Sequence, residues 1–178
     1  RDLCRRIDEP RGTVTVALVG KYITMPDAYM SVTESLRHAA YFHNIKVDIR
    51  WVSSESLEHG DLSPLEGVDG VLVPGGFGHR GIEGKINASR FARLSRVPYL
   101  GLCLGMQCAS IDFARDVLGM EDANSTEFDS GTHNPVISLM EEQAKVRERG
   151  GTMRLGSYDC RLTPGSLARK AYDQDLIK

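Results

Sequence analysis

The feature that constrains the fold most is the run Gly-Leu-Cys-Leu-Gly at residues 101–105, where a cysteine has glycine two positions away on each side. The apolar residues 97–100 precede it, and residues 106–118 follow with apolar side chains at helical spacing. This pattern predicts a strand, a one-residue turn at Cys103 and a helix. Neighbours without a Cβ let strand and helix approach, and the helix N-terminus favours the thiolate. We therefore interpret Cys103 as a nucleophile rather than an ordinary buried cysteine.

Strand-like and helix-like segments alternate along the first 118 residues. The predicted strands are residues 13–19, 45–52, 69–74 and 97–102, and the predicted helices are residues 28–43, 82–95 and 106–118. Asp27 is the expected N-cap of the first helix, and Leu94 is expected to point inward from the second. The alternation predicts an α/β fold, a flavodoxin-like three-layer sandwich with a mostly parallel sheet and ligands at the carboxyl ends of its strands. Beyond Gly119 it stops, and residues 152–163 are predicted as a hairpin or two short strands.

A second glycine-rich loop follows another predicted strand, at residues 73–78 with the sequence Val-Pro-Gly-Gly-Phe-Gly. Glycine lets backbone N–H groups turn toward a bound oxygen. In a doubly wound sheet this loop lies beside the Cys103 turn. The N–H of Gly76 or Phe77, together with that of Leu104, would then form an oxyanion hole for a tetrahedral intermediate.

Composition excludes some classes of function. The 22 Lys and Arg against 24 Asp and Glu give a net charge of −2, so charge offers no argument for binding nucleic acid or a membrane. No apolar run approaches the roughly 20 residues of a membrane span. The first residues are charged, which argues against a signal peptide, and the missing initiator Met suggests a piece of a longer chain. Four cysteines without a paired framework or zinc spacing suit the cytoplasm: Cys4, Cys103, Cys108 and Cys160.

Several further segments, taken with these two motifs, resemble one enzyme family. Residues 101–107 are similar to the nucleophile motif of class I glutamine amidotransferases, and residues 74–76 to their oxyanion loop. The closer resemblance is to the glutaminase domain of the CTP synthase family, from about Val14 to past Gly156. It is carried in order by residues 19–22, 27–32, 77–86, 123–129 and 150–156.

The resemblance implies roles for individual residues. Cys103 would attack the side-chain amide of glutamine and form a γ-glutamyl thioester, with the N–H groups of Gly76 and Leu104 binding the oxyanion. Glu127 would bind the α-amino group of the substrate, a task that suits a carboxylate. The glutamine pocket would be shaped by Gly76, Leu104, Gly105, Met106 and Gln107. The loop associated with activation by GTP would contain Phe77, Arg80, Gly81 and Glu83.

The resemblance also implies partners. Ammonia would pass to an N-terminal synthase domain of the same polypeptide, where ATP with Mg²⁺ activates UTP for amination to CTP. Residues 1–12 would be the linker from that domain and residues 13–178 the amidotransferase domain, which itself needs no cofactor or metal. A homo-oligomer and an activating GTP would complete the full-length enzyme.

One departure from the family pattern concerns proton transfer. A thiol nucleophile needs a base, and later an acid for the leaving ammonia. The family supplies both through a downstream His-Pro-Glu segment, but no histidine follows His133. We therefore expect the C-terminal part of the domain to be missing and the chain alone to be inactive. None of the five histidines precedes a glutamate by two positions: His38, His43, His59, His79 and His133.

Three functions compete at this point. The first is the glutaminase part of a CTP synthase. The second is another cysteine hydrolase on the same sheet, such as an amidotransferase with a different acceptor or a PfpI-like peptidase or chaperone. The third is a non-catalytic regulatory module that keeps the fold. Glu127 and residues 150–156 favour the first over the second.

Overall fold

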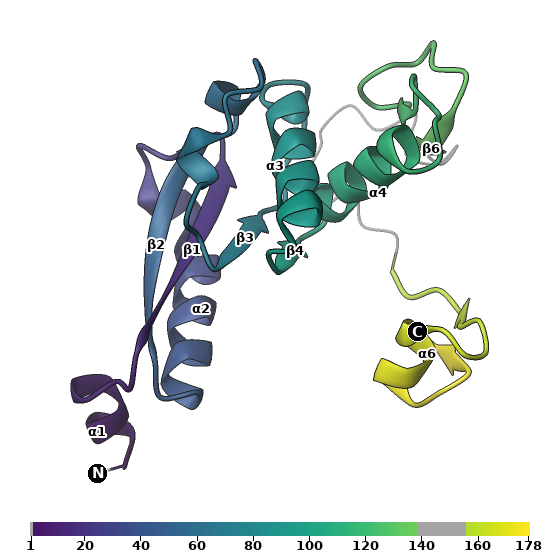
Figure 1. Cartoon of the computed structure of the whole chain (residues 1–178). Helices are drawn as coiled ribbons and strands as arrows, with labels where there is room; N and C mark the ends of the chain where they lie inside the picture. The colour runs from purple at the N-terminus through teal and green to yellow at the C-terminus, as the bar shows by residue number, and fades with distance from the viewer. Residues whose placement is uncertain (1, 139–155) are drawn as a thin grey trace. The chain divides into compact units, whose positions relative to one another are not determined.

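The computed structural model describes residues 2–138 and 156–178 (Figure 1). The chain divides into two compact units, residues 1–139 and 140–178. In the second unit, β7 (Cys160–Arg161) pairs antiparallel with β8 (Leu176–Ile177), and α6 (Leu167–Tyr172) lies between them in sequence. Of the hairpin or two short strands predicted within residues 152–163, the described part contains one short strand, β7, and its partner β8 comes from the end of the chain. Residues 152–155 lie outside the described residues.

The first unit contains a four-stranded parallel sheet. Its strands are β1 (Thr13–Gly20), β2 (Lys46–Ser53), β3 (Gly70–Val73) and β4 (Tyr99–Gly101), in the order β2-β1-β3-β4. β2 lies on one side of β1, and the next two strands, β3 and then β4, are added on the other side. The order therefore reverses between β1 and β3. In open α/β sheets this reversal is where ligands bind, outside the carboxyl ends of the strands.

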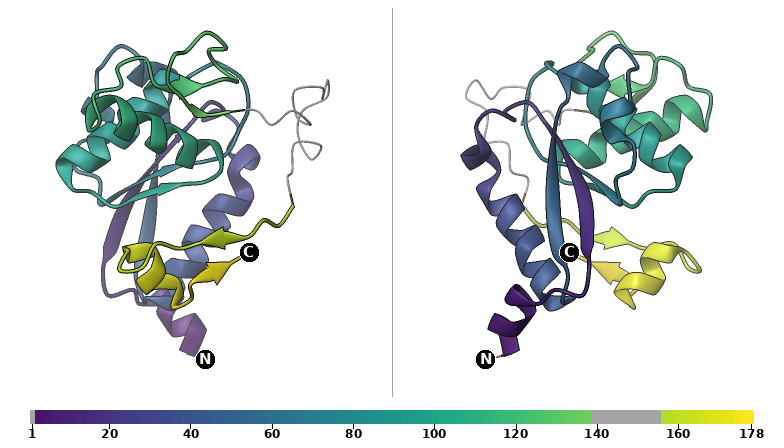
Figure 2. Two further views of the ribbon diagram at one scale, coloured as in Figure 1. Left: turned by 90° about the vertical axis from the view of Figure 1, so that its right-hand side faces the viewer. Right: turned by 60° about the vertical axis from the view of Figure 1, so that its left-hand side comes forward.

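Helices cover both faces of this sheet, as Figures 1 and 2 show. On one face Leu18 and Leu72 pack with Val32 and Leu36 of α2 (Met30–Phe42). On the other face, alternate strand residues pack against α3 (Ile82–Ser95): Ala17, Val19, Val71 and Val73 meet Ala88 and Ala92. Side chains that alternate between two covered faces are typical of buried parallel strands. The predicted three-layer sandwich is confirmed.

Two details of the helices differ from the sequence prediction. Residues 26–29 form a 3-10 turn, η1 (Pro26–Tyr29), and α2 begins at Met30, so Asp27 is not its N-cap. Leu94 is exposed rather than inward, because α3 turns its small residues toward the sheet and Leu94 toward solvent. Residues 2–8, predicted as part of a linker, form α1 (Asp2–Asp8), and the Arg6 guanidinium donates to the Phe42 carbonyl.

The helix α4 (Leu104–Asp116) packs against α3 through Ile82, Ile86, Leu104, Cys108 and Ile111. Next to this apolar contact, Arg93 of α3 donates two hydrogen bonds to the carboxylate of Asp112, at 3.0 and 3.2 Å. Asp112 is only 3 % exposed, whereas the neighbouring pair Arg90–Asp116 lies nearer to solvent. A buried carboxylate depends on its partner far more than an exposed one does.

We expect Arg93→Ala to lower the free energy of unfolding by about 2 kcal/mol, because it leaves the Asp112 carboxylate buried without its cation. The partial exposure of Arg93 keeps this loss below that of a fully buried pair. The matched control is Arg90→Ala, with an expected loss under about 1 kcal/mol since its ion pair is solvated. Urea unfolding of both variants measures the difference, and equal losses would contradict this account of the two pairs.

Candidate active site

Cys103 stands between β4 and α4, as predicted, and its thiol is exposed. Its backbone has φ of 52° and ψ of −104°, and it occupies the N-cap position of α4. A positive φ is uncommon for a residue with a side chain and costs conformational energy, so the surrounding structure must hold it. The predicted sharp turn with the thiol at its apex is confirmed.

The two flanking glycines explain how the turn is held. A Cβ on Gly105 would lie 2.1 Å from the Val73 carbonyl oxygen, and one on Gly101 would lie 2.5 Å from the Gly105 backbone. Only glycine therefore lets α4 start directly against β3 and β4. The Tyr99 hydroxyl donates to the Gly105 carbonyl at 2.7 Å and adds a further link between β4 and α4.

The glycine-rich loop after β3 lies beside Cys103, as predicted. The Leu102 N–H donates to the Val73 carbonyl at 2.9 Å, which joins the two strands just before both loops. A Cβ on Gly75 would lie 3.4 Å from the Cys103 Cβ, and one on Gly76 would lie 3.7 Å from Leu104 Cδ2. The loop thus lies beside the Cys103 turn and the first turn of α4, with little more than the room of one side-chain carbon between them. The oxyanion role of the Gly76 and Leu104 N–H groups remains a prediction.

Glu127 reaches the same loop from a distant part of the sequence. It follows β5 (Asn124–Ser125), which pairs with β6 (Pro135–Ile137), and its carboxylate accepts a long hydrogen bond from the Gly78 N–H at 3.5 Å. On the other side of the loop, the Lys21 ammonium donates to the carbonyls of Phe77 and Gly78 at 2.6 and 3.4 Å. Glu127 therefore stands next to the glycine-rich loop, and its contact with a substrate ammonium remains a prediction.

Gly105, Met106 and Gln107 make up the first turn of α4, directly after the thiol. Gly105 is buried against β3, Met106 is half exposed and Gln107 is partly buried. Their positions are compatible with a substrate pocket over the turn, and their contacts with glutamine remain predictions.

Of the residues that the resemblance links to activation, Phe77, Arg80 and Gly81 lie on the loop between β3 and α3, and Glu83 lies in the first turn of α3. Their role in activation remains a prediction. Arg80 pairs with Glu55 at 3.3 Å and stacks over the Tyr22 ring at 5.4 Å, whereas Glu83 pairs with Arg115 at 2.8 Å. Phe77 is partly exposed. Gly81 has φ of 73°, and a Cβ there would lie 2.1 Å from Ser54 Oγ, so this turn also requires glycine. The loop and the first turn of α3 are therefore tied to the segment after β1, to the 3-10 turn η2 (Glu55–Leu57) and to α4.

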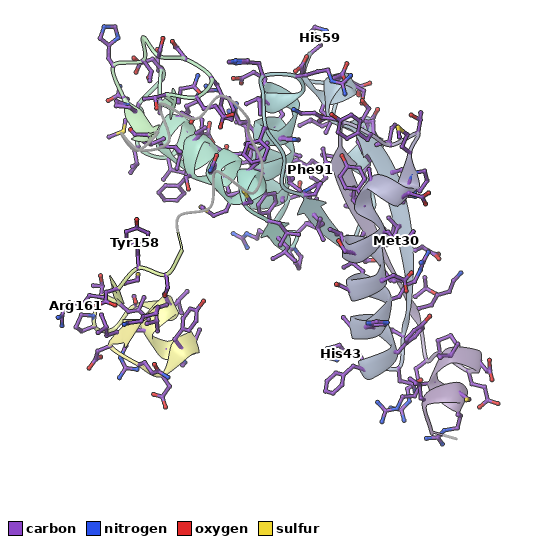
Figure 3. All side chains as sticks on the ribbon, turned by 180° about the vertical axis from the view of Figure 1, so that it is seen from behind. Met30, His43, His59, Phe91, Tyr158 and Arg161 are labelled. Carbon is purple, nitrogen blue, oxygen red and sulfur yellow. The ribbon has the colours of Figure 1, made fainter. Side chains whose placement is uncertain are left out.

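No histidine forms a hydrogen bond with Cys103 in the described residues. Figure 3 shows His43 at the C-terminal end of α2 and His59 at the opposite end of the sheet. His133 pairs with Asp122 at 3.1 Å, and the His79 ring contacts Phe128 edge-on at 6.0 Å. His38 lies on α2 beside Tyr41. That none of the five is the catalytic base remains a prediction.

The other cysteines differ in exposure. Cys108 is fully buried between α3 and α4, and burial raises the pKa of its thiol to about 12. Cys160 is exposed. Cys4 is exposed as well.

Two lysines near the glycine-rich loop were not anticipated from sequence. Lys21 follows β1 directly, and its position at the carboxyl end of a buried strand is the signal that could have found it. Lys85 lies on α3 between Ile82 and Ile86, on the apolar stripe, and its side chain is 1 % exposed. Its sequence context gives no sign that a cation is buried there.

Metal ligands and membrane spans were also sought. Within residues 2–138 and 156–178, no group of three His, Cys, Asp or Glu side chains could hold a metal ion. Among the helices of the same residues, none has both the length and the apolar character that crossing a membrane requires.

At the carboxyl end of the sheet, a cysteine stands at a strained strand-to-helix turn beside a glycine-rich loop. A comparison with known families agrees with this arrangement. Residues 24–174 match the family described as glutamine amidotransferase class-I, so the chain belongs to the class I glutamine amidotransferases.

Individual relatives are named more specifically. The chain is 59 % identical over 162 residues to the CTP synthase of Moorella thermoacetica and 56 % identical over 177 residues to that of Herpetosiphon aurantiacus. These alignments cover 91 and 99 % of the chain but only 30 and 33 % of the relatives, so the chain spans about a third of their length. The solved glutaminase domain of Trypanosoma brucei CTPS, with bound acivicin, matches with a TM-score of 0.72 and 34 % identity, over 92 % of this chain and 64 % of that one.

Proposed function

We propose that this chain is the glutaminase part of a CTP synthase, in which Cys103 hydrolyses the side-chain amide of glutamine and supplies ammonia for the amination of UTP. The observation that carries the proposal is the contact between the Cys103 turn and the Gly75–Gly76 loop, with Glu127 beside that loop. The names of the relatives supply the acceptor reaction.

In this mechanism the Cys103 thiolate attacks the amide carbon, and the N–H groups of Gly76 and Leu104 bind the resulting oxyanion. Collapse of the intermediate expels ammonia, which takes its proton from a general acid, and leaves a γ-glutamyl thioester that water hydrolyses. Glu127 holds the substrate α-ammonium, and the first turn of α4, residues 105–107, shapes the pocket. None of these steps requires a cofactor or metal.

The remaining parts of the reaction belong to a longer polypeptide. We propose that a synthase domain of the same chain uses ATP and Mg²⁺ to activate UTP, and that the enzyme is a cytoplasmic homo-oligomer. We place activation by GTP at the loop that contains Phe77, Arg80, Gly81 and Glu83. The ties of this loop to Glu55, Tyr22 and Arg115 support a role in transmitting a change to the site.

Limited alkylation tests the nucleophile. We expect iodoacetamide to label Cys103 before Cys108, because Cys103 is exposed at a helix N-terminus and Cys108 is buried. The variant Cys4→Ser/Cys160→Ser removes the two other exposed thiols, and mass spectrometry locates the adduct. Acivicin, the compound bound in the Trypanosoma brucei domain, should slow the labelling of Cys103. Preferential labelling of Cys108, or labelling of Cys103 that acivicin leaves unchanged, would contradict the assignment.

A further inference from the structure

Lys85 of α3 is a buried cation to which the proposed reaction assigns no role. It is the largest fully buried side chain of the described residues. It lines a pocket of about 190 Å³ together with Lys21, Tyr22, Tyr29, Gly76 and Phe77. Lys21 and Tyr22 follow β1, and Gly76 and Phe77 follow β3, so this pocket lies at the point where the strand order reverses.

The Lys85 ammonium has no counter-ion among residues 2–138 and 156–178. No ion pair and no hydrogen bond of its Nζ is found there, and the largest ionic influence on it is the repulsion from Lys21. The Nζ lies 3.9 Å from the position that a Cβ on Gly76 would occupy. A charge buried without a partner is costly, and here it is held against the loop next to the nucleophile.

We propose that Lys85 is a positioning residue for acyl transfer at Cys103, whose ammonium raises the positive potential at the Gly76 backbone where the oxyanion develops. This inference rests on the proposed roles of Cys103 and Gly76. The thiolate forms a bond to the acyl carbon, and the carbonyl π pair moves onto oxygen. When the intermediate collapses, that pair returns and the leaving group departs with its bonding electrons. A fixed positive charge nearby stabilises the anionic intermediate without any motion.

The charge of Lys85 should change within an accessible pH range. Burial, and secondly Lys21, lower the pKa of Lys85 to about 8, whereas Cys108 of α4 acts in the opposite direction. The groups that face it are Lys21, Tyr22 and Tyr29 around the pocket and Cys108 from α4. The ammonium is therefore present at pH 7 and is lost as the pH rises through about 8.

Two reactions of Cys103 separate this effect from a general effect on the thiol. Acylation by p-nitrophenyl acetate passes through an oxyanion, and its leaving group needs no proton, whereas alkylation by iodoacetamide forms no oxyanion. Both need the thiolate, so the ratio of their rate constants cancels the ionisation of Cys103. Both rates are measured in the Cys4→Ser/Cys160→Ser background, with Cys103→Ala as the blank.

We expect Lys85→Met to lower this ratio about tenfold at pH 7 and to change alkylation less than twofold. In the chain with Lys85 the ratio should fall between pH 7 and 9, and in Lys85→Met it should be flat. Cys108→Ala, a change at a buried neighbour that keeps the ammonium, should retain the ratio at pH 7. If the ratio in the chain with Lys85 did not change between pH 7 and 9, or if Lys85→Met slowed both reactions equally, the inference about Lys85 would be overturned and the proposed function would stand. Absence of any Cys103-dependent reaction would overturn the proposed function instead.

Discussion

The 178-residue chain is expected to release glutamate from glutamine at least about 10²–10⁴-fold more slowly than the same chain extended by a downstream His-Pro-Glu segment. General acid–base catalysis contributes about this factor, and no histidine of the described residues is hydrogen-bonded to Cys103. The Cys103 turn and the glycine-rich loop both lie within residues 73–105, so we expect this part of the site to form in both chains.

Glutamate release by the two forms is the measurement, and each form carries its own Cys103→Ala control. Turnover by the short chain that depends on Cys103 and equals that of the extended chain would mean that one of the five histidines is the base. His79 would then be the first to substitute, because it lies on the same loop as Gly76 and Phe77.

Glu127→Gln in the extended chain is expected to raise KM for glutamine roughly ten- to hundredfold and to affect kcat less. A hydrogen bond to a charged group is worth about 1.5–3 kcal/mol, which converts to this range. The proposed contact is with the α-ammonium, which does not react, so its loss weakens substrate and transition state together. The side-chain carbonyl oxygen introduced at position 127 can still accept a hydrogen bond from the Gly78 N–H, so the loop itself should keep its position.

The matched control is Glu121→Gln, which removes an exposed carboxylate near the end of α4 and should leave KM unchanged. Steady-state glutamate release at varied glutamine concentration gives both constants. Unchanged KM in Glu127→Gln would show that Glu127 lies outside the substrate pocket.

The sequence predicted the α/β sandwich and the Cys103 turn because both depend on local patterns. Alternating apolar strands and helices specify a covered parallel sheet, and glycines at positions 101 and 105 permit the close contact of strand and helix. The parallel order also brings the ends of β3 and β4 to one edge, which placed the Gly75–Gly76 loop beside Cys103 in advance. The start of α2 was predicted less well, since the 3-10 turn before it shares the same apolar spacing.

Only the tertiary structure revealed how side chains from distant segments meet. Glu127 contacts Gly78 across 49 residues, Arg93 pairs with the buried Asp112, and Lys85 enters the reversal point of the sheet from an apolar helix face. Such pairings follow from how helices and loops pack on the sheet. The spacing of residues within one segment does not encode the distance between two segments that are far apart in the sequence. The local sequence therefore determined the nucleophile turn and the layers around it, and tertiary packing decided which charges surround the turn.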